Sequence, residues 1–243
     1  MVWEGNPPSI SCAGGEETNL RILVIAPHMD DEVLGVGGTI CRHVSEGDTV
    51  HVFIVANRAY DHKYDPALIQ REKDHVLRAK EVLGYQDIQF GDLKDEQLDD
   101  QLAPVIQSIE RCVADFQPDV VYVNHRGDTN QDHRAVFEAV MIACRPISSL
   151  LENRIKRVLC YEVLSCTDQA PPFHEYAFQP NHYVDISAFL AQKEAALKCY
   201  RTELREFPHP RSVKAVRVLA QRRGMEMCIH AAEAFIIVRD FWG

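Results

Sequence analysis

The residues best suited to chemistry form the run PHMDDE at 27–32, directly after the apolar stretch RILVIA. That stretch has the composition of a buried strand, so the run begins where the strand ends, and open α/β sheets bind their ligands at that edge. The run offers one imidazole, His28, and the carboxylates of Asp30, Asp31 and Glu32. Adjacent carboxylates repel one another, and a bound cation would remove the repulsion. Glu32 is the acid that suits the first turn of a following helix.

The chain contains the ligands that such a cation needs. A catalytic zinc site uses three nitrogen or oxygen ligands and keeps one position open for water, whose pKa it lowers to about 7. His28 and Asp31 are three residues apart in a turn that enters a helix, and His133 follows a later expected strand. Strand ends that are distant in sequence meet in a doubly wound sheet, which makes a His₂Asp site reasonable. Asp30 is then the expected general base, and Asp132 the acceptor that fixes an imidazole tautomer.

Strand-like runs and helical spacings alternate along most of the chain. Expected strands lie at 21–26, 50–56, 87–90, 119–124 and 157–163, and expected helices at 32–45, 67–83, 101–116 and 133–144. Later elements are a strand at 183–186, helices at 187–201 and 213–223, and a strand at 234–238. This order predicts an α/β fold, a mostly parallel, doubly wound (Rossmann-like) sheet with helices on both faces. We expect a loose arm over residues 1–18 and a single domain over 19–243.

Composition excludes several classes of function. The formal net charge of −10 argues against nucleic acid and anionic membrane surfaces as partners. No apolar run near the N-terminus approaches the ~20 residues that span a bilayer, and no secretory signal is visible. The eight cysteines have no C-x-x-C spacing, as expected of free thiols in a reducing compartment. We therefore expect a cytoplasmic protein with a small-molecule substrate, and the sequence leaves a homo-oligomer open.

At the acidic run the chain resembles the PIG-L/LmbE-like family of zinc-dependent N-acetylglucosaminyl deacetylases. The A-H-P-D-D-E motif of that family corresponds to APHMDDE at 26–32, and its H-x-D-H motif corresponds to NQDH at 130–133. The likeness extends over nearly the whole chain. By position it implies metal ligands at His28, Asp31 and His133.

The resemblance also implies that Asp30 is the base, but two positions depart from the family pattern. Met29 replaces a proline, with little chemical consequence. Asn130 stands where many members carry a histidine that stabilises the oxyanion and protonates the leaving amine, and asparagine can donate a hydrogen bond but cannot transfer a proton. His125, His209 or a water on the metal are the candidates for that transfer. Arg58 and His209 are candidates for contact with the substrate.

These observations predict a hydrolase that removes the N-acetyl group from an amino sugar of the N-acetylglucosamine type, or from its conjugate. Zinc is the expected metal, although a His₂Asp site also accepts Fe²⁺ or Co²⁺. One alternative is an amidase on a non-sugar acyl amide, such as a thiol conjugate, and another is a noncatalytic metal-binding protein. A nucleotide-binding enzyme, suggested by Gly35, Gly37 and Gly38, is disfavoured because these glycines lie inside an expected helix and the acids would repel a pyrophosphate.

Overall fold

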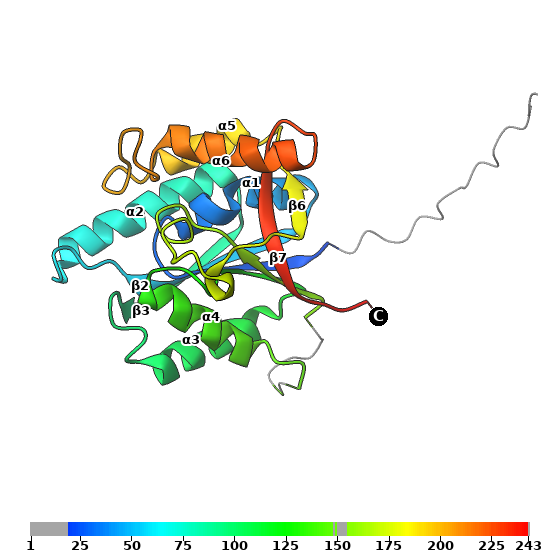
Figure 1. Ribbon diagram of the computed structural model, residues 1–243. Helices are drawn as coiled ribbons and strands as arrows, with labels where there is room; N and C mark the ends of the chain where they lie inside the picture. Colours follow the sequence, from blue (N-terminus) through cyan, green and yellow to red (C-terminus); the bar gives the residue numbers. More distant parts are fainter. Residues whose placement is uncertain (1–18, 148, 150–154, 243) are drawn as a thin grey trace, which may run out of the picture.

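The computed structural model describes residues 19–147, 149 and 155–242, and the expected arm over 1–18 lies outside them (Figure 1). The strands of the described part are β1 (Arg21–Ala26), β2 (Thr49–Asn57), β3 (Asp87–Lys94), β4 (Val120–Asn124), β5 (Arg157–Tyr161), β6 (His182–Asp185) and β7 (Ala232–Asp240). The helices are α1 (Asp31–Ser45), α2 (Pro66–Leu83), α3 (Leu102–Phe116), α4 (Gln131–Ala143), α5 (Leu190–Leu197) and α6 (Val213–Glu226), with a 3₁₀ helix η1 (His174–Tyr176).

The strands form one sheet in the order β3-β2-β1-β4-β5-β7-β6. Strands β1 to β5 run parallel, whereas β7 runs antiparallel to both β5 and β6. The prediction of a mostly parallel α/β sheet is confirmed. The sequence pattern does not reveal the direction of β7, because buried and exposed side chains alternate in the same way whichever way a strand runs.

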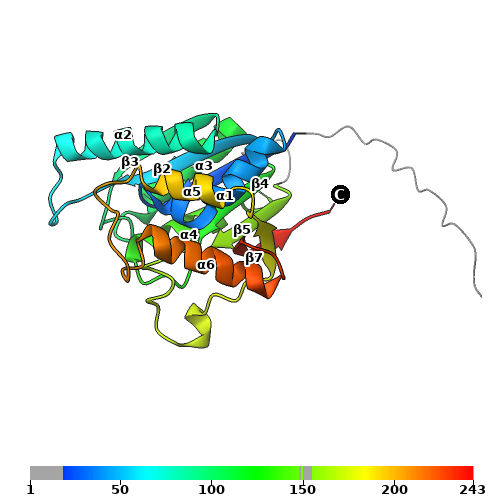
Figure 2. The same ribbon diagram turned by 90° about the horizontal axis from the view of Figure 1, so that it is seen from above.

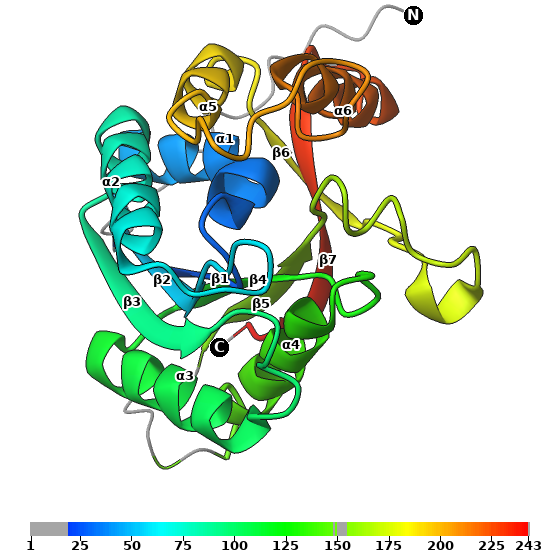
Figure 3. The ribbon, with the colours of Figure 1, turned by 90° about the vertical axis from the view of Figure 1, so that its left-hand side faces the viewer.

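Helices cover both faces of the sheet. Helices α1, α2, α5 and α6 lie on one face, and α3 and α4 on the other (Figures 1 and 3). Helix α5 lies between α2 and α6, and it contacts both (Figure 2). Side chains of the central strand β1 alternate between two cores, with Ile22 and Val24 in the first and Leu23 and Ile25 in the second. No helix of the described residues is long and apolar enough to cross a membrane.

The glycines of α1 are explained by close packing. A Cβ atom at Gly35 would overlap with the ring of Tyr161 on β5, and one at Gly38 would come within 2.7 Å of Ile186. Both glycines lie inside a regular helix and contact side chains of the core. They therefore let α1 approach its neighbours, which is a different task from exposing bare N–H groups to a phosphate.

Candidate metal centre and active-site cavity

The three predicted ligands meet at the carboxyl ends of β1 and β4. His28 lies in the turn between β1 and α1, Asp31 begins α1, and His133 lies in the first turn of α4. Strand β1 pairs with β2 on one side and with β4 on the other. The strand order therefore reverses between β1 and β4, and this is the point at which doubly wound sheets open a crevice for ligands.

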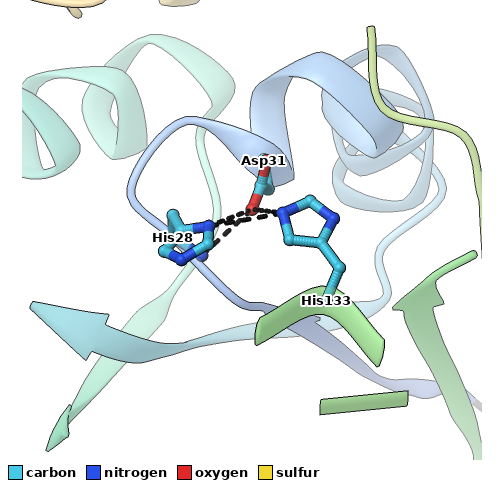
Figure 4. Close-up of side chains that lie close together, drawn as sticks. All are labelled: His28, Asp31 and His133. Carbon is cyan, nitrogen blue, oxygen red and sulfur yellow. Dashed lines mark hydrogen bonds and ion pairs between the residues drawn. The ribbon is translucent and has the colours of Figure 1, made fainter. Parts of the chain in front are cut away.

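The ligand atoms form a small buried triangle (Figure 4). Nδ1 of His28 lies 3.3 Å from Nε2 of His133 and 3.5 Å from Oδ2 of Asp31, and these last two atoms are 3.2 Å apart. Ligands that stand about 2.1 Å from a tetrahedral ion are about 3.4 Å from one another. The second oxygen of Asp31, Oδ1, is buried without a hydrogen-bond partner among the described residues. The donor types and the spacing therefore fit a first-row divalent metal.

Further carboxylates orient the two imidazoles. Nδ1 of His133 donates to Oδ2 of Asp128 over 2.8 Å, which leaves Nε2 as its free lone pair. Nε2 of His28 lies 3.1 Å from both Asp132 and Asp95, which leaves Nδ1 free. Asp132 thus contacts His28, and its carboxylate also accepts the backbone N–H groups of residues 96 and 98. Sequence reasoning missed Asp128 and Asp95, which lie in loops without a recognisable pattern.

The charges of the cluster favour a cation. Burial alone would lower the pKa of His133, but the carboxylates of Asp31 and Asp128 outweigh it and raise this pKa to about 9. The pKa of His28 is also raised, because hydrogen bonds to Asp132, Asp31 and Asp95 outweigh burial. Negative groups that hold protons on two buried imidazoles would also attract a metal ion, and metal binding would displace those protons.

Asp30 has an unusual backbone and a free carboxylate. Its φ angle of 130° lies in a region that side chains rarely adopt. Neither carboxylate oxygen has a hydrogen-bond partner among the described residues, and Oδ2 lies 3.3 Å from Nη1 of Arg211. Burial raises the pKa of Asp30 to about 7 although Arg211 opposes the rise. Such a carboxylate can accept a proton from a nearby water.

Glu32 supports Asp30 and does more than begin the helix. Its Oε2 atom accepts the backbone N–H of Asp30 over 3.2 Å, and its Oε1 atom accepts the hydroxyl of Tyr200. The side chain is fully buried, and burial raises its pKa to about 8. Glu32 lies in the first turn of α1 as expected, but the sequence did not predict its contact with Tyr200, which is distant along the chain.

A polar cavity of about 530 Å³ adjoins the cluster. Its lining includes Asp95, which contacts His28, and Arg211, which contacts Asp30. Oε2 of Glu203 lies 2.6 Å from Nη1 of Arg211 and 3.1 Å from Nη2 of Arg58. Basic and acidic side chains dominate the wall, as would suit a hydroxylated substrate. The remaining lining residues are Ala59, Glu96, Thr129, Asn130, Gln131, Ser165, Cys166, Arg205 and His209.

The predicted site residues outside the triangle do not all gather here. Arg58, Asn130 and His209 line the cavity. His125 lines a different cavity, where its Nε2 atom lies 3.1 Å from the carbonyl oxygen of Tyr176. The side-chain oxygen of Asn130 accepts the N–H of residue 132 and so caps α4. Of the two candidate histidines for proton transfer, the structure thus brings only His209 to the cavity wall.

The fold and the site define an α/β protein with a candidate metal centre at the switch point of its sheet. The family described as PIG-L, GlcNAc-PI de-N-acetylase, matches residues 23–144, which is half of the chain. The chain belongs to this family, and the predicted resemblance is confirmed.

Named relatives agree with this assignment. The chain is 30% identical over 135 residues to the uncharacterized deacetylase YaiS of Escherichia coli, covering 54% of this chain and 71% of that one. It is 25% identical to the probable N-acetyl-alpha-D-glucosaminyl L-malate deacetylase 2 of Bacillus anthracis, covering 68% and 70%. The crystal structure of the conserved protein TT1542 from Thermus thermophilus superposes with a TM-score of 0.76 at 26% identity, covering 92% and 97%.

Proposed function

We propose that this protein is a metal-dependent N-deacetylase that acts on an amino sugar of the N-acetylglucosamine type or on its conjugate. The observation that carries the proposal is the buried triangle of His28, Asp31 and His133 beside the unpaired carboxylate of Asp30. The Bacillus anthracis relative, named for a glucosaminyl malate, supports the sugar. The polar wall of the adjoining cavity also suits hydroxyl groups better than an apolar acyl chain.

His28, Asp31 and His133 would hold the metal, for which zinc is our first choice. When bound, a divalent ion acidifies a water molecule and polarises an amide carbonyl. Asp128 and Asp132 keep the lone pairs of the two imidazoles directed at the centre.

Asp30 performs the proton transfers. Its carboxylate accepts a proton from the attacking water, because none of its oxygens is committed to another hydrogen bond among the described residues. It then returns that proton to the nitrogen of the leaving amine. Asn130 cannot take this part, since an amide side chain does not transfer protons. His209 lies in the cavity wall and is placed to contact the substrate.

Metal analysis combined with acetate release tests the proposal. We expect about one equivalent of zinc, iron or cobalt, and acetate release from N-acetylglucosamine or its conjugates. Asp30→Asn should lose at least about 100-fold in kcat while keeping the metal, and His133→Ala should lose both metal and activity. Asp115→Asn, an exposed acid on α3, is the matched control.

Two results would contradict the proposal. Unchanged acetate release in Asp30→Asn would remove the base from the mechanism. Hydrolysis of an acylated thiol conjugate in preference to every sugar in the panel would replace the substrate class and leave the metal chemistry in place.

A further inference from the structure

Arg211 is the only cation of the described residues in ion-pair contact with Asp30. It lies in the segment between α5 and α6, and its side chain is only 14% exposed. Nη1 lies 3.3 Å from Asp30 and 2.6 Å from Glu203, while Nε donates to Oγ of Ser165 over 2.9 Å. Nη2 has no hydrogen-bond partner among the described residues. The guanidinium is therefore held on two sides and keeps two N–H donors unused.

The charge of Arg211 is permanent in this position. The carboxylate of Asp30 raises its pKa further above the ordinary range, although burial opposes the rise. Arg58 also contacts Glu203, but no contact joins it to Asp30 among the described residues. Asn130 also lines the cavity and has a donor in Nδ2, but no contact joins it to Asp30 among the described residues. Arg211 is thus the donor that lies beside the proposed base and also lines the cavity.

We propose that Arg211 is a catalytic residue that stabilises the negative charge on the acetyl oxygen during amide hydrolysis. The inference rests on the proposed function and adds a residue that the sequence motifs do not contain. Preorganised donors in a site shielded from water stabilise developing charge strongly, because they need no reorganisation during the reaction. Ser165 and Glu203 supply that preorganisation by fixing the plane of the guanidinium.

Asp30 and Arg211 have different tasks in the reaction: Asp30 transfers a proton, and Arg211 donates a hydrogen bond to the acetyl oxygen. The water oxygen bonds to the acetyl carbon, one water proton passes to Asp30, and the π electrons of the carbonyl move to its oxygen. Arg211 donates a hydrogen bond to that oxygen without giving up a proton. When the carbonyl re-forms, the C–N bond breaks and its electron pair remains on nitrogen, which takes the proton from Asp30. The products are the amine and acetic acid, which ionises.

The decisive measurement is the steady-state kinetics of Arg211→Ala and Arg211→Lys in the full-length, metal-loaded protein. We expect Arg211→Ala to lose about 100- to 1,000-fold in kcat with KM within about threefold of the wild type. Arg211→Lys should lose less, because it keeps the charge without the planar fork. Arg222→Ala, which removes an arginine on the far part of α6, is the control and should match the wild type. Metal content and circular dichroism establish that each variant is folded and loaded.

Two further measurements separate a catalytic role from a structural one. Millimolar guanidinium chloride should restore part of the kcat of Arg211→Ala, whereas sodium chloride at the same concentration should not. A methylphosphonamide of glucosamine imitates the tetrahedral intermediate, so its inhibition constant should rise across the variants in proportion to the loss of kcat/KM.

The possible negative results distinguish the proposed function from the role of Arg211. A wild-type protein that releases no acetate from any sugar would overturn the proposed function itself. An active wild type whose kcat survives Arg211→Ala within threefold would overturn only the role of Arg211. So would a loss confined to KM, or a phosphonamide that binds all variants equally well.

Discussion

The carboxylates of this site differ in task because their surroundings differ. Asp31 faces two imidazoles, whose attraction holds its pKa well below the usual range in spite of burial. The carboxylate of Asp30, its neighbour in the chain, has no hydrogen-bond partner among the described residues, and burial raises its pKa. The positive φ of Asp30 turns its side chain away from the direction that a regular helix start would give. The backbone at one residue therefore separates the proposed ligand from the proposed base.

Asp128 should control how tightly the centre binds its metal. It accepts the Nδ1 proton of His133, and Thr167 donates to its other oxygen. Such outer contacts contribute about 10- to 100-fold to metal affinity. We expect Asp128→Ala to weaken zinc binding by that factor in competition with a chromophoric chelator. Asp115→Ala, which removes an exposed acid on α3, is the control. Equal affinity in Asp128→Ala and the wild type would show that His133 needs no such support.

The same residues show how far sequence reasoning reaches. The proximity of His28, Asp31 and His133 could be predicted because they follow two apolar runs, and parallel strands bring their carboxyl ends together. The contact of Asp128 with His133 could not be predicted. Either Asp128 or Asp132 could accept a hydrogen bond from His133, and the conformation of the folded loop determines which one does. The position of Arg211 beside Asp30 could not be predicted for another reason. Arg211 comes from an irregular segment whose path over the sheet depends on how α5 and α6 pack.

Among the elements, α1 is fixed in place by a buried ion pair. Nζ of Lys193 on α5 donates to the carbonyl of Leu34 and lies 2.5 Å from Glu233 on β7. Glu233 also accepts the N–H groups of Gly38 and Thr39. The pair therefore joins α5, β7 and the helix that begins with Asp31. The late elements position the candidate metal centre although they supply none of its proposed ligands.

Helix α4 begins directly after Asn130, a residue that the sequence indicated as a candidate for catalysis. The side chain of Asn130 accepts the N–H of Asp132 over 2.8 Å, which is N-cap geometry. We expect Asn130→Ala to lower the free energy of unfolding by about 1 kcal/mol in urea titrations, because a first-turn donor loses its acceptor. Asn130→Ser and Asn130→Asp should keep most of the stability. If all three variants unfolded at the same urea concentration as the wild type, the cap would contribute nothing.

At the scale of the molecule, the proposed metal would tie two crossover units together. Its ligands come from the β1–α1 turn, from the start of α1 and from α4. Helices α1 and α4 pack on opposite faces of the sheet (Figure 3). An ion that binds only the folded chain raises its stability by about 2.7 kcal/mol at a hundredfold excess over Kd. For a chain of this size that corresponds to a rise in Tm of about 5 to 10 °C.

Thermal unfolding with and without a chelator measures this effect. We expect zinc to raise the Tm of the chelated wild type, and magnesium to leave it unchanged because imidazole suits zinc far better. His133→Ala should show no rise. Among the described residues, two other groups bring potential ligand atoms together. One is His28, Asp95 and Asp132, which shares His28 with the proposed centre, and the other is His43, Glu46 and Asp48. A rise that persists in His133→Ala and disappears in His43→Ala would place the stabilising ion at the group of His43. Zinc would then be absent from the proposed centre under those conditions, and the link between the two faces of the sheet would have to come from packing alone.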